Sequence, residues 1–414
     1  MHLVDNSSNS STAAVQTDPV LIAGAGPVGC ALALLLAQKG VPVILLEAGT
    51  ELPEDLRAST FHPPSLDLLD DLGVTEKLVE VGLKVYDYQY RDRRTNEIAK
   101  FDMKHLAGET QHPYRLQCEQ FKMTRIVVEM LKDYDCAEVI FDAQVLGFRE
   151  TDNGIDVLAF TQGDEKRYHA SFLIGCDGAN SRVRQASGVR FEGLTYPEQF
   201  LVASTTFPFE EHFDDLSWVN YVSDPDEWCV MLKTIDLWRV LIPSPLDADR
   251  DTLLSDAFIQ ERLQNLCPKE GDYDIHHRTL YRVHQRVAET YRVSPHALLA
   301  GDSAHINNPL GGMGMNGGLH DAFNLGDKLL RILCDGEDMD PLLDLYNRQR
   351  RKICVDFVQA HTIRNKKLME STDEGVQRAR QQEFLRMAGD PDLAREFLLR
   401  TSMIDSLRDS LKIA

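Results

Sequence analysis

The sequence lacks any long apolar segment. Its longest apolar run, residues 28–37, is too short to cross a bilayer, for which a helix needs about 20 apolar residues. Residues 1–18 are polar and Ser-rich without an apolar core, so they predict a flexible leader and not a signal peptide. We therefore expect neither a membrane partner nor secretion.

Paired cysteines and basic clusters are also missing. The eight cysteines are scattered without a Cys-x-x-Cys pair, and His276 and His277 have no further ligands at a useful spacing, so neither a metal site nor a disulfide framework is predicted. The 44 Lys and Arg residues face 65 Asp and Glu, and the net charge of -21 repels nucleic acid. These absences favour a reduced, cytoplasmic protein, a monomer or homodimer, whose partners are small molecules.

A dinucleotide-binding pattern is present near the start of the chain. The apolar strand Val20–Ala23 runs into Gly-x-Gly-x-x-Gly and an Ala- and Leu-rich helix, and an acid follows 23 residues after the first glycine. This context makes an otherwise weak motif specific, because the glycines allow a tight turn, a close pyrophosphate and helix packing, and the acid accepts from ribose hydroxyls. The residues assigned to this contact are Gly24, Gly26, Pro27, Val28, Gly29 and Glu47.

Two other apolar strands end in an acid. Phe172–Cys176 leads into Asp177, and Ala297–Ala300 leads through Gly301 into Asp302. Parallel strands place their carboxyl ends at one edge of a sheet, where open α/β folds bind ligands. We therefore expect both carboxylates near the dinucleotide.

A glycine-rich loop and a long helix follow Asp302. After Pro309, glycines let the backbone approach a ligand, and apolar residues then recur at helical spacing. The helix is predicted to begin near Met315 and Asn316, with its free amides and positive dipole end toward an electron-rich or anionic group. A second Gly-x-Gly-x-x-Gly at 312–317 has no strand directly before it and is not assigned to a dinucleotide.

The stretch from Gln199 to Pro243 predicts a different architecture. Long alternating segments indicate an antiparallel sheet with one face buried, which forms a wall of the substrate site. Tyr221 and Arg239 lie on this sheet as candidates for ligand contact, whereas its three tryptophans are expected in the core.

Other segments carry more general predictions. Val139–Phe148 and Ile155–Phe160 predict a β-meander, and the chain from Tyr346 to its end is mostly helical by pattern. His305 is expected to order the loop after Asp302. A basic run is most simply a solvated helix face; its members are Arg348, Arg350, Arg351 and Lys352.

Three of these motifs, in this order, resemble the single-component FAD-dependent aromatic hydroxylases, the para-hydroxybenzoate hydroxylase family. They are the fingerprint with Glu47, the Asp177-Gly178 segment, and the stretch from Gly301-Asp302 through Asn316, and the resemblance covers residues 20–350. The third is the most specific, because Gly-Asp-x-Ala-His, Pro-x-Gly-Gly-x-Gly-x-Asn and Asp-Ala-x-Asn-Leu are hard to produce by packing alone.

The resemblance implies roles for single residues. It places Asp302 at the ribityl chain of FAD, Asp177 near the pyrophosphate and the reduced nicotinamide cofactor, and Pro309 beside the flavin ring. Pro309 is therefore a candidate for the catalytic region, together with Arg239 and Tyr221, which are candidates only because they lie on the predicted sheet. Further FAD contacts implied in the same way are Arg57, Gln117, Gly312, Gly314, Met315 and Asn316.

The implied fold class is α/β, a Rossmann-like FAD-binding domain with an inserted antiparallel β-sheet substrate domain and C-terminal helices. After the leader at 1–18, the expected units are a discontinuous FAD-binding domain at 19–84, 113–185 and 286–345, a substrate domain at 85–112 and 186–285, and helices at 346–414.

The activity implied by the resemblance is a monooxygenation. NADH or NADPH reduces FAD, O2 forms a flavin C4a-hydroperoxide, and a small aromatic or heteroaromatic ring bearing a hydroxyl, amino or carboxylate group is hydroxylated. A flavin-dependent halogenase or isoprenoid reductase of the same fold is an alternative, although residues 237–243 lack the paired tryptophans of halogenases. A non-catalytic flavin-binding regulatory protein is the alternative from another class.

Overall fold

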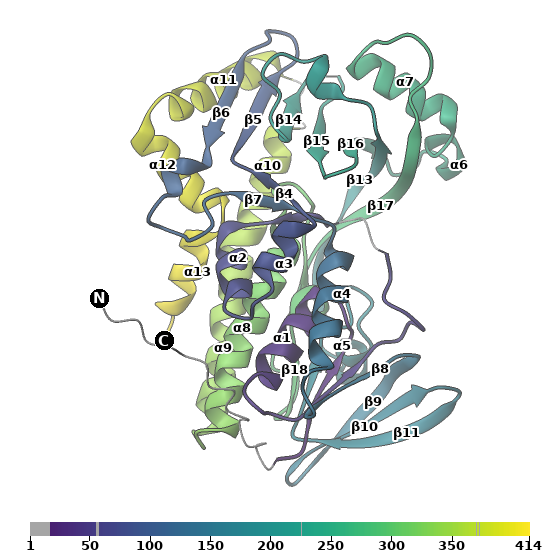
Figure 1. The fold of residues 1–414 in the computed structure, drawn as a ribbon, viewed down its shortest axis with the longest axis vertical. Helices are drawn as coiled ribbons and strands as arrows, with labels where there is room; N and C mark the ends of the chain where they lie inside the picture. The colour runs from purple at the N-terminus through teal and green to yellow at the C-terminus, as the bar shows by residue number, and fades with distance from the viewer. Residues whose placement is uncertain (1–16, 55–57, 225, 370, 372) are drawn as a thin grey trace.

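The computed structural model describes residues 17–54, 58–224, 226–369, 371 and 373–414, so Arg57 and most of the leader lie outside the described residues. The chain forms two lobes along its long axis (Figure 1). The lower lobe contains the N-terminal strand and helix, and the upper lobe contains the large β-sheet and the C-terminal helices α11 and α12.

The core of the lower lobe is a five-stranded parallel sheet, in the order β18-β12-β1-β2-β8. The sequence of these strands is almost wholly apolar because both faces of the sheet are covered. Helices α1, α4 and α8 pack together, and a three-stranded antiparallel sheet contributes to the same core. The strands are β1 (Val20–Ala23), β2 (Val43–Leu46), β8 (Ala137–Ile140), β12 (Phe172–Gly175) and β18 (Ala297–Leu299). The helices are α1 (Pro27–Ala37), α4 (Gln120–Leu131) and α8 (Met313–Leu333).

The predicted meander is confirmed in part. Its three strands are β9 (Ala143–Thr151), β10 (Gly154–Thr161) and β11 (Asp164–Ala170). Val139 and Ile140, at the start of the segment assigned to it, instead belong to β8 at the edge of the parallel sheet. A short apolar run does not by itself show which sheet the strand joins.

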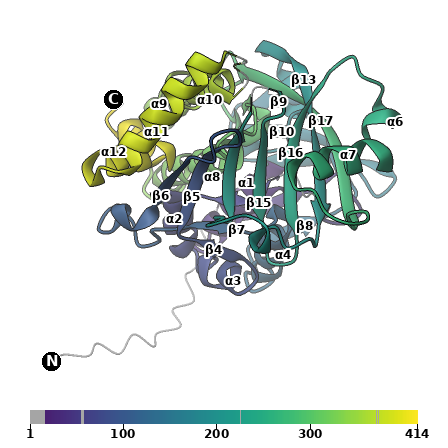
Figure 2. The same ribbon diagram turned by 90° about the horizontal axis from the view of Figure 1, so that it is seen from above.

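The upper lobe is built on an eight-stranded sheet with the order β19-β17-β13-β16-β15-β14-β5-β6. The predicted antiparallel pairing of the strands between Gln199 and Pro243 is confirmed, because β13, β16, β15 and β14 pair antiparallel in turn. Two features differ from the prediction: β5, from an earlier part of the chain, adds to β14 in parallel, and both faces of the sheet are covered, not one. Figure 2 shows α11 and α12 on one side of these strands and α6 and α7 on the other. The strands are β5 (Asp87–Asp92), β6 (Ile98–Asp102), β13 (Phe191–Thr205), β14 (Val219–Ser223), β15 (Cys229–Lys233), β16 (Trp238–Pro245), β17 (Ile275–Ala288) and β19 (His305–Ile306).

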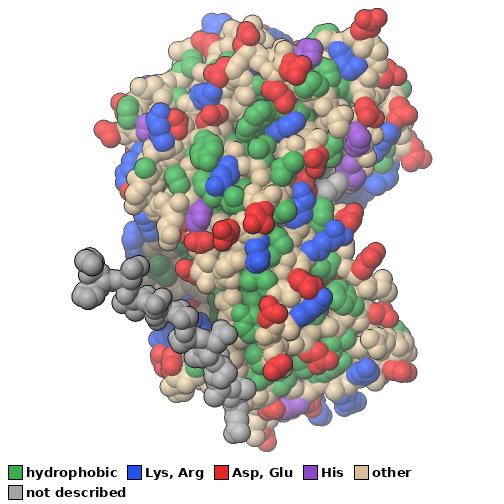
Figure 3. Space-filling view, viewed as in Figure 1, with side chains coloured by type: hydrophobic (Ala, Val, Ile, Leu, Met, Phe, Trp, Pro, Cys, Tyr) green, Lys and Arg blue, Asp and Glu red, His purple; other side chains and the backbone are tan. Residues whose placement is uncertain are grey.

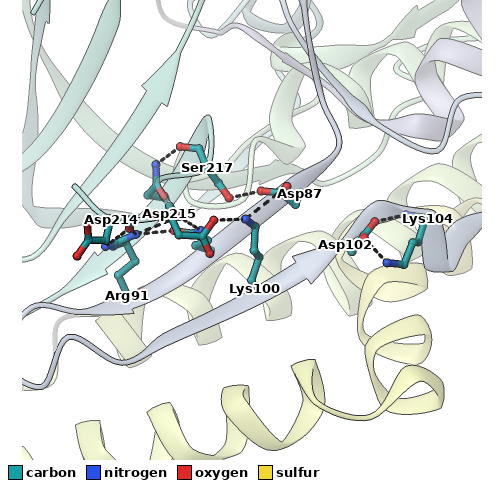
Figure 4. A network of polar contacts seen from close by, with 10 residues as sticks. Asp87, Arg91, Lys100, Asp102, Lys104, Asp214, Asp215 and Ser217 are labelled. Atoms are coloured by element: carbon teal, nitrogen blue, oxygen red, sulfur yellow. Dashed lines mark hydrogen bonds and ion pairs between the residues drawn. The ribbon is translucent and has the colours of Figure 1, made fainter. Parts of the chain in front are cut away.

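Polar contacts attach the edge strands β5 and β6 to the segment before β14 (Figure 4). The Arg91 guanidinium donates to the carbonyl of Asp214 at 3.0 Å, and the Lys100 ammonium lies 2.6 Å from the Asp215 carboxylate. Asp87 accepts from the Ser217 hydroxyl. A parallel pair has no hairpin to align it, so these contacts hold the two segments together.

The C-terminal region is helical, as predicted. It contains α9 (Met339–Ile353), a π-helical turn (Cys354–Gln359), α10 (Ala360–Met369), α11 (Glu374–Ala388), α12 (Pro391–Thr401) and α13 (Ile404–Leu411). The first of these helices begins before Tyr346, with Asp338 as its N-cap. Phe384 of α11 and Phe397 of α12 cover the upper sheet, and Phe384 stacks on Tyr90 with 3.9 Å between ring centroids.

The remaining elements are short. The small sheet β3-β7-β4 lies between the two lobes (Figure 1), and Gly73, with φ of 70°, separates α2 from α3. The elements are β3 (Thr60–Phe61), α2 (Pro63–Asp70), α3 (Thr75–Glu80), β4 (Leu83–Val85), η1 (Met103–Leu106), β7 (Arg115–Gln117), α5 (Arg182–Ser187), η2 (Phe209–Glu211), α6 (Arg250–Leu253), α7 (Asp256–Leu266) and η3 (Gly301–Ser303).

The surface carries mixed charge. Acidic and basic side chains are interspersed over the face seen in Figure 3. Within the described ranges, no helix has the length and apolar character that a membrane crossing requires. The same residues contain no group of three His, Cys, Asp or Glu side chains that could hold a metal ion.

Candidate functional site

A cavity of about 960 Å³ runs from the start of α1 to the underside of the eight-stranded sheet. Most residues singled out in the sequence line it, although they come from segments far apart in the chain. Those that line it are Gly24, Gly26, Pro27, Val28, Glu47, Asp177, Tyr221, Asp302, Pro309, Gly312, Gly314 and Met315. Gly29, Gln117, Arg239 and Asn316 do not line it, but each contacts a residue that does.

The turn between β1 and α1 depends on close packing. Gly24 has φ of +102°, and a Cβ there would lie 2.5 Å from the carbonyl oxygen of Cys176. A Cβ on Gly29 would lie 2.0 Å from the carbonyl oxygen of Gly24. At Gly26 a Cβ would meet nothing within 4 Å, so the backbone faces open space there. This geometry is what a tight turn, a packed helix and an approaching phosphate each require.

Glu47 follows the last residue of β2 and lies beside this turn. Its carboxylate accepts from the Ala25 N–H at 2.8 Å and from the Gly49 N–H at 2.9 Å. The acid is therefore held against the glycine turn, and its remaining lone pairs are available to a ligand hydroxyl.

The other two predicted acids differ in their surroundings. Asp177, half-buried, accepts from the Ser181 hydroxyl at 2.5 Å and from the Arg182 N–H at 2.6 Å. It is thus engaged with the start of α5. Asp302 sits in η3 with its side chain exposed to the cavity.

Behind Asp302 lies a buried ionic network that joins η3 to α8. The Asp321 carboxylate accepts from the Gly301 N–H at 3.1 Å, from His305 Nε2 at 2.7 Å and from Arg350 Nε at 2.7 Å. Burial alone would raise the pKa of Asp321, but the His305 and Arg350 cations outweigh it and lower the pKa to about 2. His305 therefore orders the segment around Asp302, as predicted.

The prediction of a solvated basic run is wrong for Arg350. Its side chain is 2% exposed, because α9 packs directly on α8 and places it beside Asp321. The helical period puts successive residues on different faces, so one basic run contains both buried and exposed members. The Asp-Ala-x-Asn-Leu motif, which begins at Asp321, was the available signal for this contact.

Helix α8 begins at Met313, earlier than predicted, and Gly312 is its N-cap with φ of 66°. The residues from Gly312 to Met315 line the cavity, so the positive end of the helix dipole faces it. Asn316 lies behind the cavity lining: its Oδ1 accepts from the His62 N–H at 2.8 Å, and its Nδ2 donates to the carbonyl oxygens of the lining residues Thr60 and Gly312. These bonds fix the helix start against β3.

The sheet end of the cavity is mainly apolar. Tyr221 lies on β14 and stacks on Tyr90 with 4.9 Å between ring centroids. Arg239 of β16 is 2% exposed and donates to the Ser59 hydroxyl at 3.0 Å. Trp228 and Trp238 are buried in the core, as predicted. Other side chains that line this end are Val219, Val230, Leu232, Leu241, Val283 and Leu310.

Two further residues near this end, Arg115 and His62, are not predicted from the sequence. Arg115 of β7 lines the cavity and is 2% exposed. His62 is buried beside the glycine loop, and its Nε2 lies 2.8 Å from the Gly311 carbonyl oxygen. Burial lowers the pKa of His62 well below its usual range, and Arg115 lowers it further, so this imidazole is neutral. For Arg115, the sequence signal is a single arginine in the short segment before Gln117. His62 has no such signal.

The polar end fits a dinucleotide with an electron-rich ring. The starts of α1 and α8 both face the cavity, Glu47 stands at the β2 end, and space is open at Gly26. The buried Nε2 of Gln117 has no hydrogen-bond partner among the described residues, so a donor remains for a ligand. Fold and site together define a dinucleotide-dependent α/β protein with a second, apolar compartment.

Comparisons with known proteins agree. Residues 17–361 match the FAD binding domain family. The chain is 32% identical over 401 residues to para-nitrophenol 4-monooxygenase of Pseudomonas sp. (strain WBC-3), covering 94% of this chain and 97% of the relative. It is 32% identical to 6-hydroxy-3-succinoylpyridine 3-monooxygenase of Pseudomonas putida, covering 84% and 87%. The crystal structure of p-nitrophenol 4-monooxygenase from Pseudomonas putida DLL-E4 superimposes with a TM-score of 0.88 at 30% identity, covering 94% and 98%.

The chain belongs to the FAD-binding family of aromatic hydroxylases. It is a monooxygenase that uses FAD, with NAD(P)H as the reductant that is standard among these enzymes. The predicted family, fold class and activity are confirmed. The relatives are named monooxygenases, so hydroxylation is the activity they support, in preference to the halogenase, reductase and non-catalytic alternatives.

Proposed function

We propose that this enzyme oxygenates a single-ring phenol or hydroxypyridine at the carbon para to its hydroxyl, where the ring already carries a substituent. The names of three relatives support this: para-nitrophenol 4-monooxygenase, 6-hydroxy-3-succinoylpyridine 3-monooxygenase and pentachlorophenol 4-monooxygenase. Each name places the oxygenation at a substituted ring position opposite the hydroxyl. The third relative is longer, and the chain spans 63% of its length.

The chemistry of such a step balances without a further co-reactant. One oxygen atom of O2 bonds to the para carbon, and the other leaves as water with the two electrons of NAD(P)H. The para carbon then carries both a hydroxyl and the substituent. Loss of the substituent with its bonding pair, together with the hydroxyl proton, leaves a quinone. Bound FAD supplies the oxygen activation, and the protein supplies position and water exclusion.

The observation that carries the proposal is the continuity of the cavity. Its polar end reaches Glu47 and the glycine turn, and its apolar end reaches Tyr221 and Pro309 without an intervening wall. We assign the FAD contacts predicted from the sequence to the polar end, with Asp302 at the ribityl chain. Pro309, Arg239 and Tyr221 are assigned to the region where ring and flavin meet.

The division into domains and the cellular setting are also proposals. Separate hydrophobic cores under the two large sheets support an FAD-binding domain at 19–84, 113–185 and 286–345 and a substrate domain at 85–112 and 186–285. Eight free cysteines support a reducing, cytoplasmic location. A monomer or homodimer is the assembly we expect.

The test begins with the purified protein, which should be yellow or become so on reconstitution with FAD. Oxidation of NADH and of NADPH is then followed with O2 uptake on addition of 4-nitrophenol, and released nitrite is measured. We expect stimulated turnover with about one nitrite per NAD(P)H. 4-Nitroanisole, which has no hydroxyl, is the control and should give no nitrite. Hydroxylation with the nitro group retained would contradict the proposed position.

A further inference from the structure

One buried cation lines the apolar end of the cavity. A second buried guanidinium, that of Arg239, lies behind the lining and donates to the Ser59 hydroxyl. Charged side chains that line the whole cavity are Glu47, Arg115, Asp177, Arg182, Arg282 and Asp302. Five of these are half-buried or exposed, and Arg115 alone among them is buried, at 2% exposure. It extends from β7 to the neighbourhood of Tyr221 on β14.

Aromatic side chains surround Arg115. Its guanidinium carbon lies 4.0 Å from the centroid of the Tyr88 ring, whose hydroxyl is bonded to Thr401, and Tyr221 is a further neighbour. Within the part of the chain that the structure describes, no Asp or Glu pairs with it, and its Nε has no hydrogen-bond partner. His62, also close to Arg115, is neutral, because burial and the Arg115 charge lower its pKa well below the usual range.

A buried guanidinium with no anion is strongly unfavourable, because its desolvation is not offset by an opposite charge. Stacking on a tyrosine ring recovers part of this cost. The rest would be recovered by one negative oxygen presented by a ligand, which the planar guanidinium binds through directed N–H groups. The surrounding aliphatic and aromatic side chains favour a flat, apolar body for the remainder of that ligand.

We propose that Arg115 binds the ionised hydroxyl of the aromatic substrate, so that the enzyme takes phenols and hydroxypyridines as their anions. The inference rests on the proposed function, since it names the ionic form that the same compartment selects. The hydroxyl proton stays in the solvent when the anion enters. A negative oxygen donates more electron density to the para carbon than a neutral hydroxyl does, and the proposed oxygenation occurs at that carbon.

A ring carboxylate offers the same charge as a phenolate, so the test compares ligands on the oxidised holoenzyme without NAD(P)H. Binding of 4-nitrophenol is followed by absorbance, because its ionised and neutral forms differ in colour. We expect the bound phenol to have a pKa at least about 1 below that in free solution, since a tenfold preference for the anion corresponds to about 1 pKa unit. The neutral 4-nitroanisole should bind about 10- to 100-fold more weakly than the phenolate.

Two results would overturn the assignment: a bound phenol with an unchanged pKa, and 4-nitrobenzoate binding as tightly as the phenolate. Substitution provides the second arm. Arg115→Gln should abolish the preference for the anion, and Arg115→Lys should retain it with lower affinity. Arg125→Gln is the matched control, because Arg125 also lies over a ring, that of Phe121, but is exposed on α4. It should leave the preference intact.

Circular dichroism and FAD content establish that each variant is folded. Should Arg115→Gln not fold, the wild-type titration and Arg115→Lys decide the question. Failure of this inference is distinct from failure of the proposed function, because binding is measured without turnover. If 4-nitrophenol is turned over but its pKa does not change on binding, only the assignment of Arg115 is wrong. If the enzyme prefers the phenolate in an Arg115-dependent way but does not turn it over, only the proposed reaction is wrong.

Discussion

The two ends of the cavity carry opposite charges: acidic side chains line one end and a buried arginine lines the other. At the polar end, three acids, Glu47, Asp177 and Asp302, share the wall with the positive starts of α1 and α8. At the apolar end, the buried cation that lines the cavity, Arg115, lies among tyrosines and aliphatic side chains. The first surface suits a ligand with many hydroxyls and a phosphate bridge, and the second suits a flat ring with one negative oxygen.

The two ends also differ in the groups that support them. Behind the polar end, Asp321 neutralises two buried cations and holds the turn that carries Asp302. Behind the apolar end, the described residues contain no such acid for Arg115. The polar end is therefore preorganised before any ligand binds, whereas the charge of the apolar end is completed by its ligand.

The largest expected effect comes from removing the acid behind the polar end. Asp321→Ala leaves the guanidinium of Arg350 and the His305 imidazolium buried without an anion, which should lower the free energy of unfolding by about 3–5 kcal/mol. Urea denaturation at fixed FAD concentration measures it. Asp327→Ala on the exposed side of the same helix is the control and should change stability by less than about 0.5 kcal/mol. A small loss for Asp321→Ala would mean that the network is not ionic.

Acid should weaken the same network in a defined range. The folded pKa of Asp321, about 2, lies below the usual value for an unfolded Asp. Its stabilisation is therefore fully present above the unfolded value and is lost as pH falls toward 2, which amounts to about 2–3 kcal/mol. The stability difference between wild type and Asp321→Asn should be large near pH 5, where His305 is charged, and shrink below about pH 4. A difference that persists at about pH 2.5 would contradict the assignment.

Asp302→Ala tests the exposed acid of the polar end. Loss of a charge-assisted hydrogen bond should weaken FAD binding about 10- to 100-fold while stability of the FAD-free protein changes little. Retention of FAD during dialysis and gel filtration is the measurement, with Asp327→Ala again as the control. Unchanged FAD content would place Asp302 away from the cofactor.

Tyr221→Phe should have the smallest effect. It removes one neutral hydroxyl beside Arg115 and keeps the ring that stacks on Tyr90, so affinity for 4-nitrophenolate should fall about 2- to 10-fold. Ligand titration of the oxidised holoenzyme measures it. Tyr86→Phe, on an exposed ring, is the control. A loss of binding as large as that in Arg115→Gln would make the hydroxyl, rather than the cation, the main contact.

Sequence reasoning worked best where the structural requirement is local. The strand, turn and helix from Val20 to Ala37 need particular residues at fixed spacing, and the structure forms them within a residue or two of the prediction. Helix α8 was placed two residues late, because the glycine loop itself enters its first turn. Arg350 was misjudged because its exposure depends on where α9 lies against α8.

The residues of the apolar end could not be predicted from local sequence patterns. Arg115, Tyr88 and Tyr221 lie on β7, β5 and β14, whose proximity depends on the parallel pairing of β5 with β14. A parallel pair between segments far apart in sequence leaves no turn or spacing that marks it. The faces of the large sheet were likewise undetermined, since α6, α7, α11 and α12 come from other parts of the chain.

Local sequence was sufficient to specify the family, the cofactor and the polar end of the cavity, because glycine turns, strand ends and helix starts impose their chemistry over a few neighbouring residues. Which charges are buried followed only from the packing of the whole chain. That packing placed Arg350 beside Asp321 and left Arg115 without an acidic partner among the described residues. The burial of a side chain depends on helices and strands from every part of the chain, so no single segment of the sequence predicts it.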